Sequence, residues 1–153
     1  MRSSAVRLLP PSHGPDMADV VDRETRSRMM AAIRTRHTAP EVRVRRYLYA
    51  AGLRYRLHVD DLPGVPDIVL PRYRTVIFVH GCFWHQHSRC AKAKLPTTNR
   101  SFWAEKLAGN ARRDRLAGQA LRGEGWSVLT VWECETRDPG RLAHIVDEVR
   151  KIV

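Results

Sequence analysis

A loop at residues 80–90 carries more potential metal ligands than any other stretch of the chain, and it follows an apolar run that predicts a β-strand. Its sequence, HGCFWHQHSRC, offers three ligands at suitable spacing: Cys82, His87 and Cys90. The remaining cysteine, Cys134, follows a second apolar run at residues 126–133. Three thiolates and one imidazole are the donor set that tetrahedral structural Zn²⁺ prefers. If they share one ion, it joins the loop to the end of a strand that is distant in the sequence.

Four protein ligands leave no open coordination position, so such an ion would hold the loop in place and take no part in a reaction. Another histidine of the loop, such as His85, could replace His87 among the ligands, because spacing does not distinguish them. Three cysteines are an odd number and cannot form a closed disulfide framework. We therefore expect a reducing compartment, the cytoplasm.

The rest of the chain predicts an α/β domain with a mixed central sheet and helices on both faces. Capping residues and apolar spacing predict four helices, which begin after Asp22, Thr38, Asn99 or Ser101, and Asp138. Apolar runs predict strands at residues 54–59, 67–70, 75–79 and 126–133. The last run is apolar almost throughout, which is typical of a central strand covered on both faces. No run is long enough to span a membrane.

The charge of the chain points to nucleic acid as its partner. There are 27 Lys and Arg against 16 Asp and Glu, a formal net charge of +11, and the arginines cluster by segment. Residues 1–16 have the composition of a disordered extension and lack the features of a signal peptide. We therefore expect one folded domain at residues 17–153, for which Met17 could be the true start.

Three side chains outside the cysteine cluster remain for reaction chemistry: Asp67, His80 and His85. Two further acidic residues, Asp114 and Glu41, stand out by position, and each of the five has an ordinary structural explanation. Asp67 opens a predicted strand, and His80 and His85 lie in the loop at residues 80–90. Asp114 lies on a long predicted helix, and Glu41 fits the capping box Thr-Ala-Pro-Glu. A carboxylate that meets imidazoles on a basic surface suits metal-assisted phosphodiester hydrolysis. Whether these side chains meet depends on strand register, which the sequence does not give.

Six motifs of this chain resemble the very-short-patch-repair endonucleases, the Vsr family. They are DRETRS at 22–27, LPGVPD at 62–67, VIFVHGCFWH at 76–85, FW and EK within 102–106, NARRDR at 110–115 and VWEC at 131–134. HGCFWH is the most specific, and the match extends from Met17 to about Val149. The resemblance implies a restriction-endonuclease-like fold and an enzyme that nicks one DNA strand 5′ to the thymine of a T:G mismatch. Such mismatches arise when 5-methylcytosine deaminates.

The resemblance also implies roles in a magnesium-dependent active site. By this match Asp67 and the main-chain carbonyl of Val79 bind Mg²⁺, and His85 is the general base, oriented by Asp114. Valine is a departure at position 79, where the family typically has threonine, but a main-chain ligand should survive the change. Two further residues are expected to line the site: His80 and Glu41.

The zinc ligands that the resemblance implies are Cys82, His87, Cys90 and Cys134. One extra residue, within Ser88-Arg89, separates the last two ligands of the loop compared with the family pattern. The ion expected at this cluster is Zn²⁺, in a structural role.

By the same resemblance, a second group of residues contacts the mismatch. From composition alone Phe83 and Trp84 would be core residues. In the family this pair intercalates into DNA from one groove, and a methionine matching Met30 enters from the other. Lys106 and Asn110 match residues that face the mismatched bases. We therefore expect Phe83 and Trp84 to act as a wedge between base pairs.

Two other functions remain open from the sequence. The chain could be a zinc-stabilised DNA-binding protein without catalysis, or a restriction-type nuclease of the same fold that cuts both strands of unmodified DNA. The resemblance favours a monomer acting on T:G-mismatched duplexes, with a DNA cytosine methyltransferase and mismatch-repair proteins as functional partners.

Overall fold

The structure is a computed structural model, and it describes residues 22–31 and 36–152. The chain divides into two compact units, one ending at Ile33 and the other beginning at Arg34. In the first unit, helix α1 spans Arg23–Ala31. Asp22 caps this helix as predicted, because its carboxylate accepts a hydrogen bond from the Thr25 backbone N–H at 2.8 Å. The expected extension at residues 1–16 and the side chain of Met30 lie outside the described part.

The second unit is built on a four-stranded mixed sheet, which confirms the predicted sheet type. Its strands lie in the order β1 (Arg56–Leu57), β2 (Ile68–Leu70), β3 (Thr75–His80) and β4 (Ser127–Trp132). The first two pairings are antiparallel, and β3 pairs with β4 in parallel. The short helices η2 (Pro71–Tyr73), η3 (Ala91–Ala93) and η4 (Glu133–Glu135) lie in the connections.

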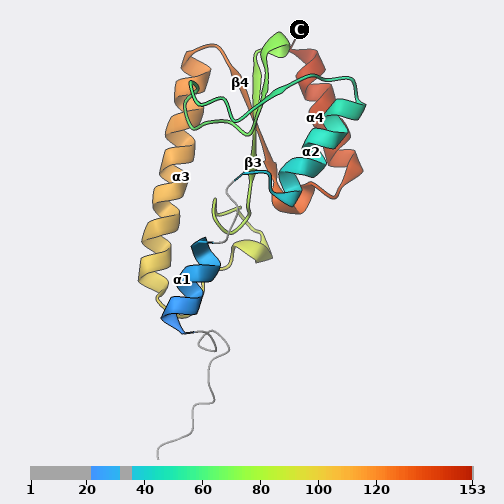
Figure 1. Cartoon of the computed structure of the whole chain (residues 1–153). Coiled ribbons are helices and arrows are strands. Elements are labelled where there is room, and N and C mark those ends of the chain that lie inside the picture. The colour runs from blue at the N-terminus through green and yellow to red at the C-terminus, as the bar shows by residue number, and fades with distance from the viewer. Residues whose placement is uncertain (1–21, 32–35, 153) are drawn as a thin grey trace, which may run out of the picture. The chain divides into compact units, whose positions relative to one another are not determined.

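Three longer helices cover the sheet on both faces, as predicted. Helices α2 (Ala39–Ala50) and α4 (Pro139–Lys151) lie on one face, and α3 (Arg100–Gly123) lies on the other (Figure 1). The larger core joins the first face to α2 and α4 through buried aliphatic residues that include Val44, Ile77 and Ile145. A smaller core on the other face includes Leu121 and Val76. No helix in the described part is long and apolar enough to cross a membrane.

Two strand predictions were wrong. The run at 126–133 was expected at the centre of the sheet, but β4 is the last strand in the order, and the interior strands are β2 and β3. Burial on two faces makes a strand apolar whether or not it has neighbours on both edges. The strand expected at 54–59 is limited to two exposed residues. It ends because His58 adopts a left-handed conformation, with φ 45°.

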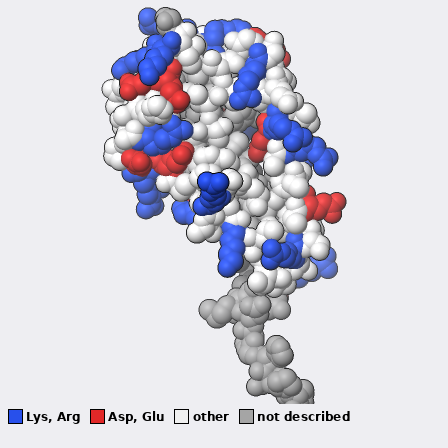
Figure 2. All heavy atoms as spheres, turned by 180° about the vertical axis from the view of Figure 1, so that it is seen from behind, with Lys and Arg blue, Asp and Glu red and all other residues white. Residues whose placement is uncertain are grey.

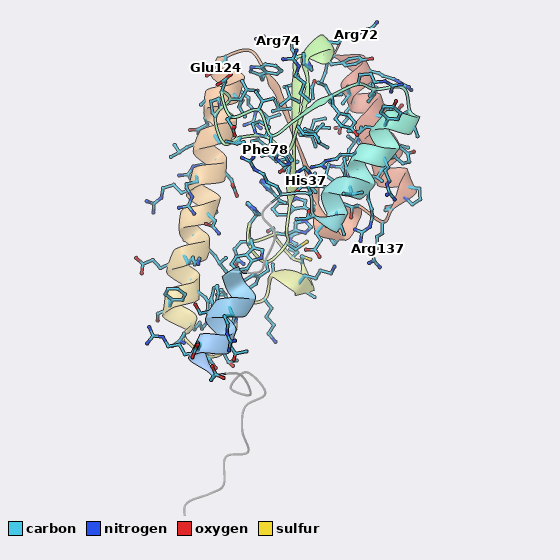
Figure 3. The ribbon with its side chains drawn as sticks, viewed as in Figure 1. His37, Arg72, Arg74, Phe78, Glu124 and Arg137 are labelled. Atoms are coloured by element: carbon cyan, nitrogen blue, oxygen red, sulfur yellow. The ribbon has the colours of Figure 1, made fainter. Side chains whose placement is uncertain are left out.

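The parallel pairing of β3 with β4 places the two metal-ligand segments side by side. His80 at the end of β3 is the register partner of Trp132 at the end of β4, so the residues that follow each strand emerge at one edge. At the opposite end of the sheet, Arg74 donates a hydrogen bond to the Glu124 carbonyl at 2.8 Å, far from His37 (Figure 3). All of the candidate chemistry in this unit is therefore collected at the His80 end.

Candidate active site and metal centre

The four predicted zinc ligands come together beyond the ends of β3 and β4. Cys82, His87 and Cys90 from the loop meet Cys134 from η4, and the potential ligand atoms all lie within 4.8 Å of one another. The His87 Nδ1 atom is 3.4 Å from the Cys134 Sγ atom. Three sulfur atoms and one imidazole nitrogen at this separation fit a tetrahedral zinc ion.

The thiols of this cluster influence one another's ionisation. Loss of hydration, followed by the adjacent Cys82 and Cys90, raises the pKa of Cys134 to about 12. A hydrogen bond from the Lys92 backbone N–H lowers the pKa of Cys90. Three thiolates cannot form so close together without a cation between them, because each negative charge disfavours the next. The donor set therefore fits a bound metal ion better than three free thiols.

The loop between β3 and η3 has a specific backbone conformation. Gln86 and Arg89 have positive φ angles of 52° and 59°, which are uncommon for residues other than glycine. The Gln86 side chain donates hydrogen bonds to the carbonyls of Phe83, at 2.8 Å, and Ala93, at 3.2 Å. His87 N–H donates to the Cys82 carbonyl at 2.9 Å. These contacts hold a strained loop in one shape, and His85 is part of it.

His80, His85 and Asp114 form a second cluster beside the cysteines. The His80 and His85 rings are stacked, with centroids 3.9 Å apart and planes within 3°. His85 Nδ1 lies 2.6 Å from Asp114 Oδ2, which reaches it from α3. A carboxylate only accepts hydrogen bonds, so Nδ1 carries the proton and Nε2 of a neutral ring is free to accept one. This is the geometry of an oriented general base.

His80 is buried and makes a different contribution. Burial, followed by the neighbouring His85, lowers its pKa to about 4. Its ring also meets the edge of Trp132, whose other neighbour is His87: the Trp132 and His87 rings stack with centroids 4.2 Å apart. A continuous series of rings thus runs from the cysteine cluster to the His85–Asp114 pair. His80 is neutral at physiological pH and serves as a packing surface for His85.

Asp67 lies at the start of β2 and faces the end of β3. Its Oδ2 atom accepts a hydrogen bond from the Val79 N–H at 2.7 Å. Burial raises its pKa to about 6, although the Val79 hydrogen bond opposes this shift. A buried carboxylate whose ionised form is destabilised is a strong candidate for binding a cation, which would restore the favourable charge. The register that the sequence left open therefore places Asp67 beside Val79.

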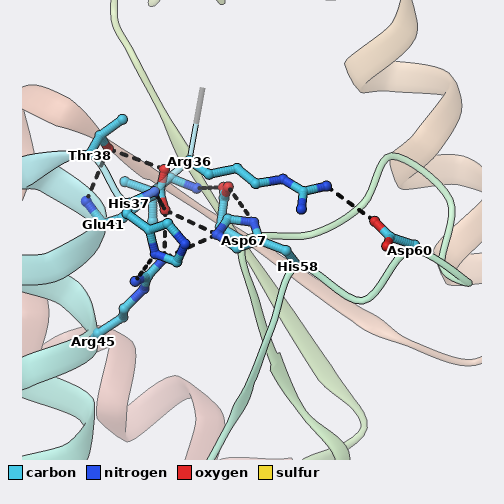
Figure 4. Close-up of polar contacts among 9 residues, drawn as sticks. Arg36, His37, Thr38, Glu41, Arg45, His58, Asp60 and Asp67 are labelled. Carbon is cyan, nitrogen blue, oxygen red and sulfur yellow. Dashed lines mark hydrogen bonds and ion pairs between the residues drawn. The ribbon is translucent and has the colours of Figure 1, made fainter. Parts of the chain in front are cut away.

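Glu41 belongs to a buried polar network next to Asp67 (Figure 4). Thr38 caps α2, because its Oγ1 accepts from the Glu41 N–H at 3.4 Å. The Glu41 carboxylate accepts from the N–H of His37, the residue before the cap, at 3.0 Å, and from Arg45 Nη2 at 2.7 Å. The capping of α2 by Thr38 is thus confirmed, while the carboxylate of Glu41 contacts the residue before the cap and lies beside Asp67.

The sequence analysis missed two residues of this network, Arg45 and His58. Arg45 lies four residues after Glu41 on α2, a spacing that predicts an ion pair on one helix face. His58 follows β1, whose pairing with β2 brings it next to Asp67. The spacing of Arg45 from Glu41 could have been read from the sequence. The position of His58 could not, because it depends on the register of β1 with β2.

The aromatic side chains of the loop pack against α3. Phe83 and Trp84 are half-buried, and each has its ring centroid within 6.0 Å of that of Trp103. Asn110 donates a hydrogen bond to the Trp84 carbonyl at 3.0 Å, so it fixes the backbone that carries the pair. The ammonium group of Lys106 is exposed, 5.8 Å from the centroid of the Trp103 ring.

Basic side chains extend beyond the site. Figure 2 shows Lys and Arg side chains scattered over one face, where they outnumber those of Asp and Glu. A positive surface of this kind attracts the phosphates of nucleic acid.

A mixed α/β sheet with an aspartate and an imidazole–carboxylate pair at one edge, on a strongly basic chain, is the arrangement of a nuclease. Comparison with known proteins identifies which nuclease family this is. The profile of "DNA mismatch endonuclease Vsr" matches residues 18–92. The DNA mismatch endonuclease Vsr of Escherichia coli is 49% identical over 126 residues, covering 82% of this chain and 80% of that protein. The chain therefore belongs to the Vsr family of DNA mismatch endonucleases.

Other relatives are described as nicking enzymes. The type II nicking enzyme V.XorIIP of Xanthomonas oryzae pv. oryzae is 45% identical, covering 86% of this chain and 98% of that protein. The type II nicking enzyme V.NmeAIP of Neisseria meningitidis is 41% identical, covering 90% of this chain and 100% of that protein. The match thus extends over nearly the whole of these two relatives.

Proposed function

We propose that this protein nicks one strand of duplex DNA 5′ to the thymine of a T:G mismatch, by metal-dependent hydrolysis of the phosphodiester bond. The observation that carries the proposal is the convergence of Asp67 with the His80–His85–Asp114 cluster at the end of β3. The family and its nicking relatives support the choice of a single-strand cut.

Asp67 and the Val79 carbonyl would hold the catalytic ion, which we propose to be Mg²⁺. The N–H and the C=O of one residue in a strand point to the same edge, and the Val79 N–H points to Asp67. The Asp67 carboxylate oxygen and the Val79 carbonyl oxygen are both hard donors that suit Mg²⁺. When bound, the ion would polarise the phosphate and stabilise its developing charge.

His85 would act as the general base in this reaction. Asp114 keeps the proton on Nδ1, so Nε2 can take a proton from the attacking water. The stacked ring of His80 limits how far the His85 ring can turn. We further propose that the cluster of Cys82, His87, Cys90 and Cys134 binds one structural Zn²⁺ that holds this loop in shape.

The proposed activity is tested with duplexes that are labelled separately on each strand. In the presence of Mg²⁺ we expect a single nick in the thymine strand of a T:G duplex and none in a matched T:A duplex. Cleavage of both strands of matched DNA would identify a restriction-type nuclease instead. Binding without cleavage of either duplex would identify a non-catalytic DNA-binding protein. The same assay across a panel of flanking sequences would define the preferred context.

We propose that Phe83 and Trp84 read the mismatch by inserting between base pairs. Unstacking one step costs a few kcal/mol and costs less at a mismatch. The double variant Phe83→Ala, Trp84→Ala should therefore reduce the preference for T:G over T:A by about a hundredfold, because a difference of about 3 kcal/mol is lost. The measurement is the ratio of single-turnover nicking rates on the two duplexes.

The control for this variant is Tyr49→Ala, since Tyr49 is an exposed aromatic side chain on α2, outside the loop at residues 80–90. It should leave the ratio unchanged. An unchanged T:G preference in the double variant, with normal thermal unfolding, would rule out the wedge.

A further inference from the structure

Arg45 is buried at the centre of the polar network beside Asp67. Its Nη2 atom lies 2.7 Å from Glu41 Oε2 and 3.1 Å from His58 Nε2, and its Nη1 atom lies 2.9 Å from His37 Nδ1. Arg45 Nε has no hydrogen-bond partner, alone among the buried side-chain nitrogens and oxygens of the described residues. An unsatisfied buried donor costs about 1–3 kcal/mol. The guanidinium is thus buried at a cost to stability.

The guanidinium contacts two members of a group of three possible metal ligands. Ligand atoms of Glu41, His58 and Asp67 lie within 4.8 Å of one another, which is close enough to share a cation. Two of these three residues, Glu41 and His58, are already in contact with Arg45. The Glu41 carboxylate also contacts the His37 N–H at 3.0 Å and Thr38 Oγ1 at 3.2 Å. Glu41 therefore serves as the counter-ion of Arg45, and Asp67 is left as the carboxylate available to a metal.

The contact with Arg45 also determines the tautomer of His58. The His58 Nε2 atom lies 3.1 Å from Arg45 Nη2, which can only donate, and 3.4 Å from Glu41 Oε2, which can only accept. In the shorter contact Nε2 accepts from Arg45, which places the proton of the ring on Nδ1. This atom is 3.9 Å from Asp67 Oδ1, longer than a hydrogen bond, while the other oxygen of Asp67 accepts from the Val79 N–H. One oxygen of Asp67 is thus bound to β3, and the other faces the ring that follows β1.

The backbone supports this orientation of His58. The residue has a left-handed conformation, φ 45°, which is costly for a side chain with a Cβ atom. Its N–H lies 3.4 Å from the carbonyl of Asp67, so the two residues are also linked through the main chain. The His58 side chain is only 8% exposed, which leaves its ring little freedom to turn away.

We propose that Arg45 and His58 are positioning residues for Asp67: Arg45 holds the His58 ring in the Nδ1–H tautomer, and His58 directs the Asp67 carboxylate toward the metal. The inference rests on the proposed role of Asp67 as a metal ligand. Groups that orient a metal ligand from behind typically contribute a factor of about 10–100 in metal affinity.

Two variants of His58 separate positioning from simple packing. His58→Leu removes the N–H that faces Asp67, whereas His58→Asn keeps a donor at the place of Nδ1 and has no tautomer to fix. We expect His58→Leu to raise the Mg²⁺ concentration for half-maximal nicking by about tenfold or more. Its KM for DNA and its kcat at saturating metal should change little. For His58→Asn, the Mg²⁺ concentration for half-maximal nicking should stay within about threefold of that of the original protein.

The role of Arg45 is tested by asking whether the effect of replacing it depends on the residue at position 58. Arg45→Met should also raise the Mg²⁺ requirement, but the effect should shrink when His58→Asn is already present, because an amide needs no partner to fix its tautomer. Such non-additivity is the expected sign of two residues acting through one another. If Arg45→Met unfolds, because it leaves Glu41 buried without a counter-ion, the His58 pair of variants still decides the proposal.

Binding of Mn²⁺ in the absence of DNA, measured by electron paramagnetic resonance, gives a readout that is independent of activity. We expect weaker Mn²⁺ binding in Asp67→Asn and in His58→Leu, and near-normal binding in His58→Asn. If Asp67→Asn weakens binding and His58→Leu does not, the positioning role is wrong while the proposed metal ligand stands. An equal loss of Mn²⁺ binding in His58→Leu and His58→Asn would also overturn the positioning role. If Asp67→Asn itself has no effect, the proposed metal site is wrong.

Discussion

Replacing Asp67 with asparagine is expected to abolish nicking and, at the same time, to make the protein more stable. Activity should fall by about a thousandfold or more, because a bound metal ion contributes several kcal/mol to the stabilisation of the transition state. The carboxamide oxygen can still accept the hydrogen bond from the Val79 N–H, so the end of β3 should keep its conformation. The loss should therefore appear in kcat and in metal binding, with the fold retained.

The stability gain follows from the raised pKa of Asp67. Burial moves this pKa from 3.8 to about 6, so the folded state holds the proton more tightly than the unfolded state does. The stabilising contribution of the protonated form is fully present below about pH 4 and is lost as the pH rises through 6. At pH 7 the ionised carboxylate costs about 3 kcal/mol, from 1.36 kcal/mol per pKa unit. Asparagine does not ionise and removes this cost.

Thermal unfolding from pH 4 to pH 8 measures the effect. The original protein should lose stability relative to Asp67→Asn between about pH 4 and pH 6, and the difference should be constant at higher pH. A matched control is Asp60→Asn, because Asp60 is exposed and pairs only with Arg36 at 3.2 Å. It should change neither nicking nor the pH profile. A fall in nicking of only about tenfold or less in Asp67→Asn, or a lower melting temperature at pH 7, would contradict the prediction.

Replacing Cys134 with serine is expected to release the proposed Zn²⁺ and to inactivate the protein. Cys134 comes from η4, beyond the end of β4, and the other three ligands come from the loop after β3. Its loss removes the link between the two segments. Because His85 lies in the same loop, the His85–Asp114 contact should be lost together with the metal.

The size of the effect follows from the energy of structural zinc sites. Binding of Zn²⁺ at such sites contributes several kcal/mol or more to folding. For a domain of this length, that corresponds to a fall in melting temperature of about 10 °C or more. Zinc content, measured by atomic absorption, should fall from one ion per chain to below one. Chelation of the original protein should reproduce the loss of nicking and of stability.

The matched control for Cys134→Ser is His87→Cys, which creates a site of four cysteines. Such sites also bind Zn²⁺, so this variant should keep one ion per chain. It should lose some activity, because the stacking of His87 on Trp132 is removed. Full stability and activity of Cys134→Ser would show that the cluster has no structural ion.

Features that depend on neighbouring residues were predictable from the sequence. The capping of α2 by Thr38 and of α4 by Asp138 was read from local patterns, and the Asp138 carboxylate indeed accepts from the Gly140 N–H at 2.9 Å. The gathering of Cys134 with the loop cysteines followed from ligand chemistry. The meeting of His85 with Asp114 came from the family resemblance, and the structure brings the two side chains together.

Features that depend on strand order and register were not predictable. The apolar run that forms β4 shows burial of its two faces, but it contains no information on which edges are paired. For the same reason the position of His58 next to Asp67 was missed, since it depends on the pairing of β1 with β2. The side chain of His58 is aimed by a left-handed backbone that no local pattern of histidine predicts.

The hydrogen bond between Asp67 and the Val79 N–H links the position of Asp67 to the correct register of β2 with β3. The bond continues the ladder of β2 and β3 by one step, using a side chain in place of a main-chain carbonyl. A shift of β2 by one residue would turn Asp67 to the other face of the sheet. If Asp67 has the proposed role, folding errors in this hairpin should therefore yield inert molecules.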